Sequence, residues 1–97
     1  MEKNPAVYMM ASKPNGTLYI GVTSNLPQRI WQHKNEVVEG FTKKYNTDIL
    51  VYYETHETME SAILREKQLK HFERKWKIEL IQEQNPNWSD LYNSIAQ

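Results

Sequence analysis

Arg29 and His33 lie four residues apart in a segment with helical periodicity. Side chains at this spacing leave one face of a helix, with β-carbons about 6 Å apart. The planar guanidinium of arginine suits phosphate oxygens, and histidine exchanges protons near neutral pH. The pair therefore offers two functions that cleavage of a phosphodiester needs. A solvated helix face is the alternative interpretation of the same spacing.

Tyr8 and Tyr19 lie in two short apolar segments, AVYMMA and LYIGVT, separated by the turn-forming sequence PNG at residues 14–16. This pattern predicts a β-hairpin. If residues 15 and 16 form a two-residue turn, the numbers of paired residues sum to 31, and both tyrosines share a face with Gly21. Glycine inside a strand often marks a close approach of backbone or ligand, although half-exposed strand tyrosines are also common without a function.

Glu66 interrupts the apolar side of a predicted helix over residues 59–72, a side formed by Ala62, Ile63, Leu69 and Phe72. It also lies within a strongly basic stretch. Residues 65–77 hold six Lys or Arg against two Glu, in a chain whose 12 Lys and Arg balance 12 Asp and Glu to give zero formal net charge. The six cations are Arg65, Lys67, Lys70, Arg74, Lys75 and Lys77. Such a run is usually a solvated helix face, but it could also bind phosphates locally.

Composition excludes several other kinds of protein. Zero net charge argues against binding of nucleic acid or anionic membrane by bulk electrostatics. The absence of cysteine excludes disulfides, thiol nucleophiles and Cys-type metal sites, and His56 and His71 lack zinc-ligand spacing. Three glycines form no nucleotide-binding loop, and no apolar run is long enough to span a bilayer. We therefore expect a cytoplasmic domain without a membrane partner.

The elements that must position these side chains follow from hydrophobic periodicity. The predicted order is β-β-α-β-α-α, an α+β domain with a small three-stranded sheet covered by helices. Trp76, Leu80 and Ile81 are expected to pack the last helix onto the core. After the hairpin strands, the predicted elements are a helix at residues 26–37 that Gly40 follows, a strand at 49–53, helices at 59–72 and 75–84, and a short C-terminal turn and tail.

Four segments together resemble the GIY-YIG nuclease superfamily, most closely its small stand-alone bacterial branch. The segments are AVYMM (6–10), LYIGVT (18–23), QRIWQH (28–33) and AILREKQLK (62–70). The first motif reads Ala6-Val7-Tyr8 where the family name has Gly-Ile-Tyr, and it keeps the tyrosine on which the chemistry depends. The resemblance covers about residues 5–92, within one expected domain of residues 1–97.

The resemblance implies a three-stranded antiparallel sheet flanked by helices, with one divalent metal ion in a concave site. Glu66 would be the metal ligand, and Mg²⁺ suits a lone carboxylate because it keeps several waters, with Mn²⁺ as the alternative. Tyr8 and Tyr19 would surround the attacking water and scissile phosphate, and Arg29 would stabilise phosphoryl charge. His33 would take part in proton transfer. Either Tyr8 or His33 is then the general base.

The resemblance also implies an asparagine with a structural or phosphate-side role near the end of the domain. Asn85 is the candidate, and Asn87 is equally near in the sequence. The expected function is that of a metal-dependent endonuclease, a hydrolase acting on DNA rather than RNA in a repair or recombination setting, with a separate protein for targeting. A nucleic-acid-binding or interaction module that keeps the fold without turnover is the alternative, and a plain protein–protein adaptor ranks below both.

Overall fold

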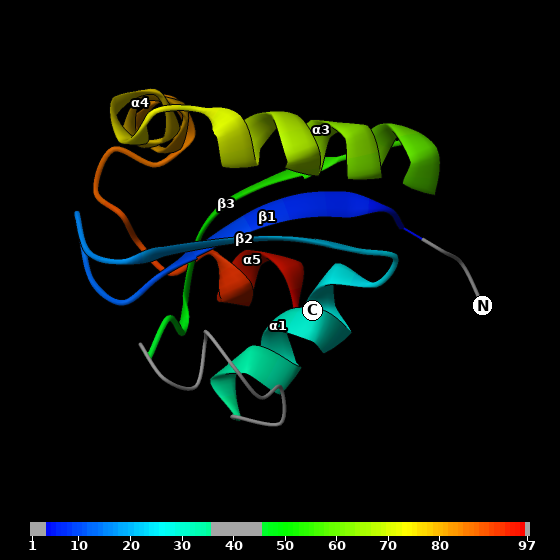
Figure 1. The fold of residues 1–97 in the computed structure, drawn as a ribbon. Helices are drawn as coiled ribbons and strands as arrows, with labels where there is room; N and C mark the ends of the chain where they lie inside the picture. Colours follow the sequence, from blue (N-terminus) through cyan, green and yellow to red (C-terminus); the bar gives the residue numbers. More distant parts are fainter. Residues whose placement is uncertain (1–3, 36–45, 97) are drawn as a thin grey trace.

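The computed structural model describes residues 4–35 and 46–96. Its centre is an antiparallel sheet of β1 (Ala6–Ala11), β2 (Leu18–Thr23) and β3 (Ile49–Thr55), in the order β2-β1-β3 (Figure 1). All six residues of the central strand β1 are buried, which requires cover on both faces of the sheet. The sheet is therefore an internal layer between helices, as the composition of β1 suggests.

The hairpin between β1 and β2 differs from the predicted two-residue turn. Paired residues such as Tyr8 and Gly21 sum to 29, not 31. The connection instead contains a turn in which the Gly16 amide donates to the Lys13 carbonyl at 2.9 Å, with Asn15 at a φ of 59°. Proline before a residue of positive φ is typical of a type II turn. The shift of two preserves the alternation, so Tyr8 and Gly21 do share a face with Tyr19.

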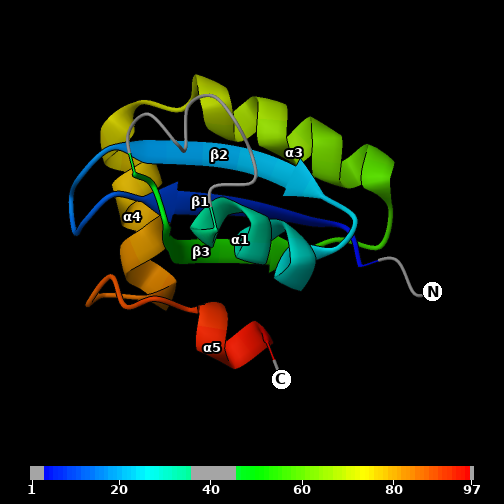
Figure 2. The same ribbon diagram turned by 90° about the horizontal axis from the view of Figure 1, so that it is seen from below.

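Helices cover both faces of the sheet. Figure 1 shows α3 (Met59–His71) and α4 (Arg74–Gln84) on one side, and α1 (Leu26–Lys34) with α5 (Tyr92–Ile95) on the other; Figure 2 views the second side. Val7, Met9 and Ala11 face the first pair, within a core cluster that includes Leu69 and Ile81. The alternate residues Ala6, Tyr8 and Met10 cluster with Leu26 and Ile30 of α1. The strand period of two thus divides one central strand between two cores.

Local sequence explains most helix boundaries. The Asn25 side chain accepts a hydrogen bond from the Gln28 amide and begins α1, and Thr58 caps α3 through the Ser61 amide. Asn35 is the C-cap of α1; residues 36 and 37 of the predicted helix, and Gly40, lie outside the described residues. The predicted short C-terminal turn forms as α5.

Two apolar side chains do not lie in the predicted core. Ile63 is 38% exposed and Trp76 is 49% exposed. Both belong to helices that touch the sheet along one narrow stripe, so these positions point away from it. Among the described residues, no helix combines the length and apolar character that crossing a membrane requires.

The segment after α4 closes the outer edge of β3. The buried Asn85 side chain donates to the Val51 carbonyl at 3.1 Å, and Asp90 accepts from the Leu50 amide at 3.2 Å. Leu91 donates its amide to the Leu50 carbonyl at 2.8 Å. An unpaired strand edge exposes backbone groups that need partners. These contacts give the outward-facing backbone of Leu50 and Val51 the partners that it needs, and the candidate site lies at the opposite side of the sheet, near β2.

Candidate active site

Tyr8 lies at the centre of the sheet, directly opposite Gly21 on β2. Its side chain is only 1% exposed and crosses the position that a β-carbon on Gly21 would occupy, 2.4 Å from the hydroxyl oxygen and 2.5 Å from Cζ. No side chain fits at such distances from a buried ring. Gly21 is thus the residue that lets the Tyr8 phenol lie flat over the neighbouring strand and reach α1.

The Tyr8 phenol is hydrogen-bonded to His33 of α1. Its Nε2 lies 2.8 Å from the Tyr8 hydroxyl oxygen, and its side chain is 3% exposed. The Tyr19 ring completes a three-ring cluster, with its centroid 5.3 Å from that of His33 and 6.2 Å from that of Tyr8. Helix α1 places His33 here because Leu26 and Ile30, on the same face, anchor it to the sheet. The two tyrosines and the histidine predicted from the sequence therefore meet.

Burial and charge set the protonation states of this cluster. Burial raises the pKa of Tyr8 well above its usual value, Tyr19 and Glu66 add to the increase, and Arg29 opposes it. Burial lowers the pKa of His33 to about 4, and the positive charge of Arg29 adds to the decrease. At neutral pH the pair is therefore a neutral phenol beside a neutral imidazole. The charges of Arg29 and Glu66 thus act in opposite directions on the ionisation of the Tyr8 phenol.

Glu66 lies on α3, which packs against β1 and β2, and its charge acts on the Tyr8 phenol. Its side chain is 16% exposed, and its Oε2 lies 3.4 Å from the Lys70 ammonium one helical turn further on. Within the described residues, no group of three or more His, Asp or Glu could enclose a metal ion. A lone, partly covered carboxylate fits Mg²⁺ or Mn²⁺, ions that keep water ligands and take further oxygens from substrate phosphates. It does not fit a structural zinc site.

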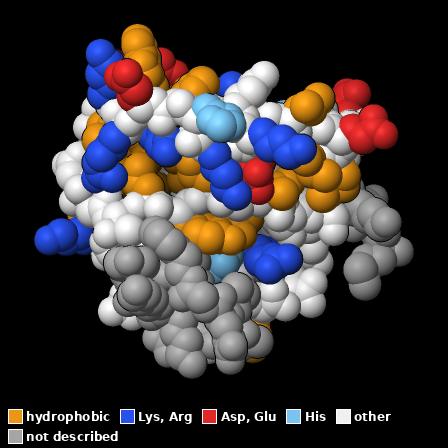
Figure 3. All heavy atoms as spheres, in the orientation of Figure 1, with side chains coloured by type: hydrophobic (Ala, Val, Ile, Leu, Met, Phe, Trp, Pro, Cys, Tyr) orange, Lys and Arg blue, Asp and Glu red, His pale blue; other side chains and the backbone are white. Residues whose placement is uncertain are grey.

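The six cations of residues 65–77 have different surroundings. Arg65 pairs with Glu54 of β3 at 2.9 Å, and Arg74 donates to the carbonyls of Asn15 and Gly16 at 2.8 and 2.6 Å. These two arginines connect helices to the sheet and hairpin. Lys67 and Lys75 are exposed, with the Lys75 ammonium over the Trp76 ring. Figure 3 shows Lys and Arg side chains gathered over the α3 and α4 side of this face.

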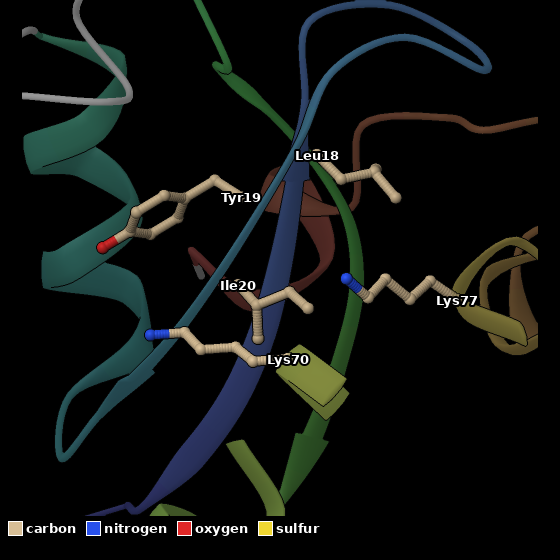
Figure 4. A pocket seen from close by; sticks show the side chains of 5 residues that line it. All are labelled: Leu18, Tyr19, Ile20, Lys70 and Lys77. Atoms are coloured by element: carbon tan, nitrogen blue, oxygen red, sulfur yellow. The ribbon is translucent and has the colours of Figure 1, made fainter. Parts of the chain in front are cut away.

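Lys70 and Lys77 line a pocket of about 300 Å³ beside β2. The rest of its lining is Leu18, Tyr19 and Ile20. In Figure 4 the Lys77 side chain extends from α4 toward the strand, whereas the Lys70 side chain and the Tyr19 hydroxyl both extend toward α1. Since Tyr19 also belongs to the ring cluster, the pocket adjoins the candidate active site. No sequence pattern indicated that Leu18 and Ile20 would form its apolar floor.

Asn85 and Asn87, the two candidates for the asparagine near the domain end, are in contrasting environments. Asn85 is buried; besides its bond to Val51, its side chain donates to the Ser89 carbonyl at 2.8 Å and accepts from the Ser89 amide at 3.0 Å. Asn87 is exposed. The Asn85 side chain thus joins the end of α4 to β3 and to the segment that leads into α5.

The order and placement of these motifs agree with the comparison with known families. A model of the GIY-YIG catalytic domain matches residues 4–79. The chain belongs to the GIY-YIG family. The matched range includes the ring cluster, Arg29, Glu66 and both pocket lysines. A GIY-YIG domain indicates nuclease-type chemistry on nucleic acid, for which such enzymes generally use a divalent metal.

Relatives of this GIY-YIG chain are similarly small. It is 35% identical to a UPF0213 protein of Staphylococcus saprophyticus, over 79% of this chain and 93% of the relative. It is 30% identical to a UPF0213 protein of Bacillus cereus, over 84% and 85% of the two chains. The solution structure of UPF0213 protein BH0048 from Bacillus halodurans aligns with a TM-score of 0.56 at 24% identity, over 90% of this chain and 92% of that one. This likeness confirms the predicted α+β fold.

Proposed function

We propose that this GIY-YIG protein is a divalent-metal-dependent endonuclease that hydrolyses phosphodiester bonds in DNA. The observation that carries the proposal is the 2.8 Å hydrogen bond between Tyr8 and His33, with Arg29 and Glu66 close enough to influence the ionisation of Tyr8. These groups come from a strand and two helices on both sides of the sheet. A purely structural hydrogen bond would not need an arginine and a partly covered carboxylate beside it.

Arg29 and Glu66 act on charge in the proposed reaction. The fixed positive charge of Arg29 stabilises the phosphate oxygens as they gain negative charge in the pentacoordinate state. Glu66 would hold Mg²⁺ or Mn²⁺, which supplies Lewis-acid stabilisation of phosphate and leaving oxygens when bound. Burial, together with the charge of Arg29, keeps the His33 pKa low, so the imidazole is unprotonated when substrate binds.

Tyr8 and His33 act on protons. A phenol whose pKa is raised is a poor base by itself, so we assign Tyr8 a relay role rather than that of an isolated base. The phosphorus–oxygen bond to the sugar breaks as the attacking water forms its bond to phosphorus, and the leaving sugar oxygen takes a proton from solvent. In this step the phenol donates its proton to Nε2 of His33 and accepts one from the attacking water. The imidazolium that results returns its proton through the phenol once the product leaves. Tyr19 packs against His33 and limits the access of other water to this pair.

Cleavage assays with labelled single-stranded, duplex and branched DNA, and with RNA, test the proposal in the presence and absence of Mg²⁺ or Mn²⁺. We expect Glu66→Gln and Arg29→Ala each to lower the rate by about 10² to 10³, the effect of removing one preorganised charge-stabilising group. Glu79→Gln, which alters an exposed carboxylate on α4, is the matched control and should cut like the wild type. Equal cutting by wild type and Glu66→Gln would refute the metal assignment. Binding without cutting by the wild type would favour the non-catalytic module.

A further inference from the structure

The pocket beside β2 combines an apolar floor with two cations from different helices. Leu18 and Ile20 form the floor, Lys70 comes from α3 and Lys77 from α4 (Figure 4). Both lysines carry a positive charge, so an anion in the pocket is attracted by both. In the described part of the chain, no acid pairs with Lys77, and the acid that pairs with Lys70 is Glu66. The pocket is therefore suited to an anion that also has an apolar part.

Lys70 connects this pocket to the proposed metal ligand. Its ammonium lies 3.4 Å from the Glu66 carboxylate, but its side chain is 54% exposed and free to rotate. An i, i+4 ion pair whose lysine lies largely in solvent is weak, so the lysine can leave it at small cost. A cation bound at Glu66 would repel the Lys70 ammonium and cancel the attraction that holds it beside the carboxylate. The anion pocket provides the other position within reach of the same side chain.

We infer that this pocket binds a backbone phosphate of a nucleic-acid strand, next to the scissile one, and that Lys70 moves from Glu66 to this phosphate when a divalent cation occupies Glu66. The inference rests on the proposed function, because it takes nucleic acid as the substrate and Glu66 as the metal ligand. Lys77 holds the phosphate in both states. Before the metal arrives, Lys70 neutralises Glu66 and prevents its charge from repelling the polyanion.

This arrangement makes metal binding and phosphate binding cooperative. A phosphate that attracts Lys70 frees Glu66 for the metal, and a metal that displaces Lys70 strengthens the phosphate site. Thermodynamic linkage requires the two effects to be equal in size. The two lysines therefore differ in function although both line the pocket: Lys70 links the sites, and Lys77 serves the phosphate alone.

Binding of Mn²⁺ without nucleic acid, followed by electron paramagnetic resonance of the free ion, tests the role of Lys70. Lys70→Gln should bind Mn²⁺ about twofold to fivefold more tightly than wild type, because an exposed competing ion pair has been removed. Lys77→Gln should bind Mn²⁺ like the wild type, and Glu66→Gln should lose the site. Unchanged or weaker Mn²⁺ binding by Lys70→Gln would overturn the linkage.

Binding of a fluorescein-labelled 12-mer oligothymidylate in EDTA, measured by anisotropy over a range of salt, tests the pocket itself. Lys77→Gln should weaken binding about fivefold in 0.1 M salt and reduce the salt slope by about 0.7, the contribution of one phosphate contact on a single strand. Lys67→Gln and Lys75→Gln remove exposed lysines from the same two helices and should have clearly smaller effects. Equal losses at all these positions would indicate a diffuse basic face and refute the pocket.

The outcomes separate this inference from the proposed function. If the wild type cuts nothing but the lysine variants behave as described, the pocket and the linkage are supported and the enzyme proposal fails. If cleavage depends on Glu66 but Lys77→Gln binds like Lys75→Gln, the enzyme proposal is supported and the pocket is refuted.

Discussion

Replacement of Gly21 by alanine tests whether Tyr8 occupies the position that the proposed chemistry requires. The backbone of Gly21 is outside the left-handed region, so alanine is compatible with its conformation. At such a site the change normally stabilises a protein by about 0.4 to 1 kcal/mol, because the unfolded chain loses entropy. Here the new β-carbon would lie 2.4 Å from the Tyr8 hydroxyl oxygen and 2.5 Å from Cζ. The buried ring must then move, and overpacking of this kind costs about 1 to 3 kcal/mol.

The two effects together predict that Gly21→Ala lowers the free energy of unfolding by about 1 to 2 kcal/mol, opposite in sign to the usual result. Urea unfolding followed by tryptophan fluorescence should show this as a midpoint lower by about 1 M, since small proteins have slopes of about 1 to 3 kcal/mol per molar urea. At urea concentrations below the unfolding transition, the cleavage rate should also decrease, because the displaced phenol no longer contacts Nε2 of His33.

A double variant shows whether the Tyr8 ring is the cause. In a Tyr8→Leu background the clashing ring atoms are absent, so Gly21→Ala should become neutral or stabilising, and the two changes should be strongly non-additive. If Gly21→Ala is at least as stable as the wild type with Tyr8 present, the ring does not lie across β2. The assembly of the site described above would then be wrong.

Two further predictions concern stability. Burial lowers the pKa of His33 from about 6.5 in the unfolded chain to about 4 in the folded protein. Between these pH values only the unfolded chain binds the proton. The free energy of unfolding should therefore decrease by on the order of 3 kcal/mol as the pH falls from 6.5 to 4. His33→Gln should remove most of that slope in urea titrations, whereas replacement of the exposed His71 should not. Asn85→Ala should cost about 2 to 4 kcal/mol because the Val51 carbonyl and the Ser89 amide lose buried partners. Asn87→Ala, at an exposed position, should change stability by no more than about 0.5 kcal/mol, and equal losses at both would contradict the assignment.

The sequence predicts which residues share a face more reliably than it predicts register. The sequence predicts a two-residue turn at residues 15 and 16, whereas in the structure Asn15 follows Pro14 in a longer connection. The register error is two residues, and side chains alternate with a period of two, so Tyr8 and Gly21 stay on one face. A shift of one residue would have separated them. Helix spacing carries the same kind of information, and Arg29, four residues before His33, acts electrostatically on both His33 and Tyr8.

Partners between distant segments could not be predicted from the sequence. Arg65 and Arg74 belong to the same basic stretch as Lys77, yet Glu54 engages the first and hairpin carbonyls the second. Which cation remains available depends on the break between α3 and α4 and on the packing angle of each helix. A count of charges along the sequence contains neither the position of this break nor the packing angles. The place of Ile20 in the pocket floor could not be predicted either, because an apolar strand residue gives the same sequence pattern whether a helix or a ligand covers it.

The distribution of these partners explains how a chain of zero net charge can act on a polyanion. The excess of four positive charges in residues 65–77 does not become a uniform basic surface, since Arg65 is neutralised by Glu54 and Arg74 is committed to the hairpin. Lys70 and Lys77 remain at the pocket beside Tyr19. Each cation that contacts a phosphate adds to affinity, so a few such contacts hold nucleic acid weakly and with little sequence preference. Under the proposed endonuclease function, we therefore expect the cutting site to be selected by the shape of the strand that fits between the pocket and the ring cluster, or by a separate targeting protein.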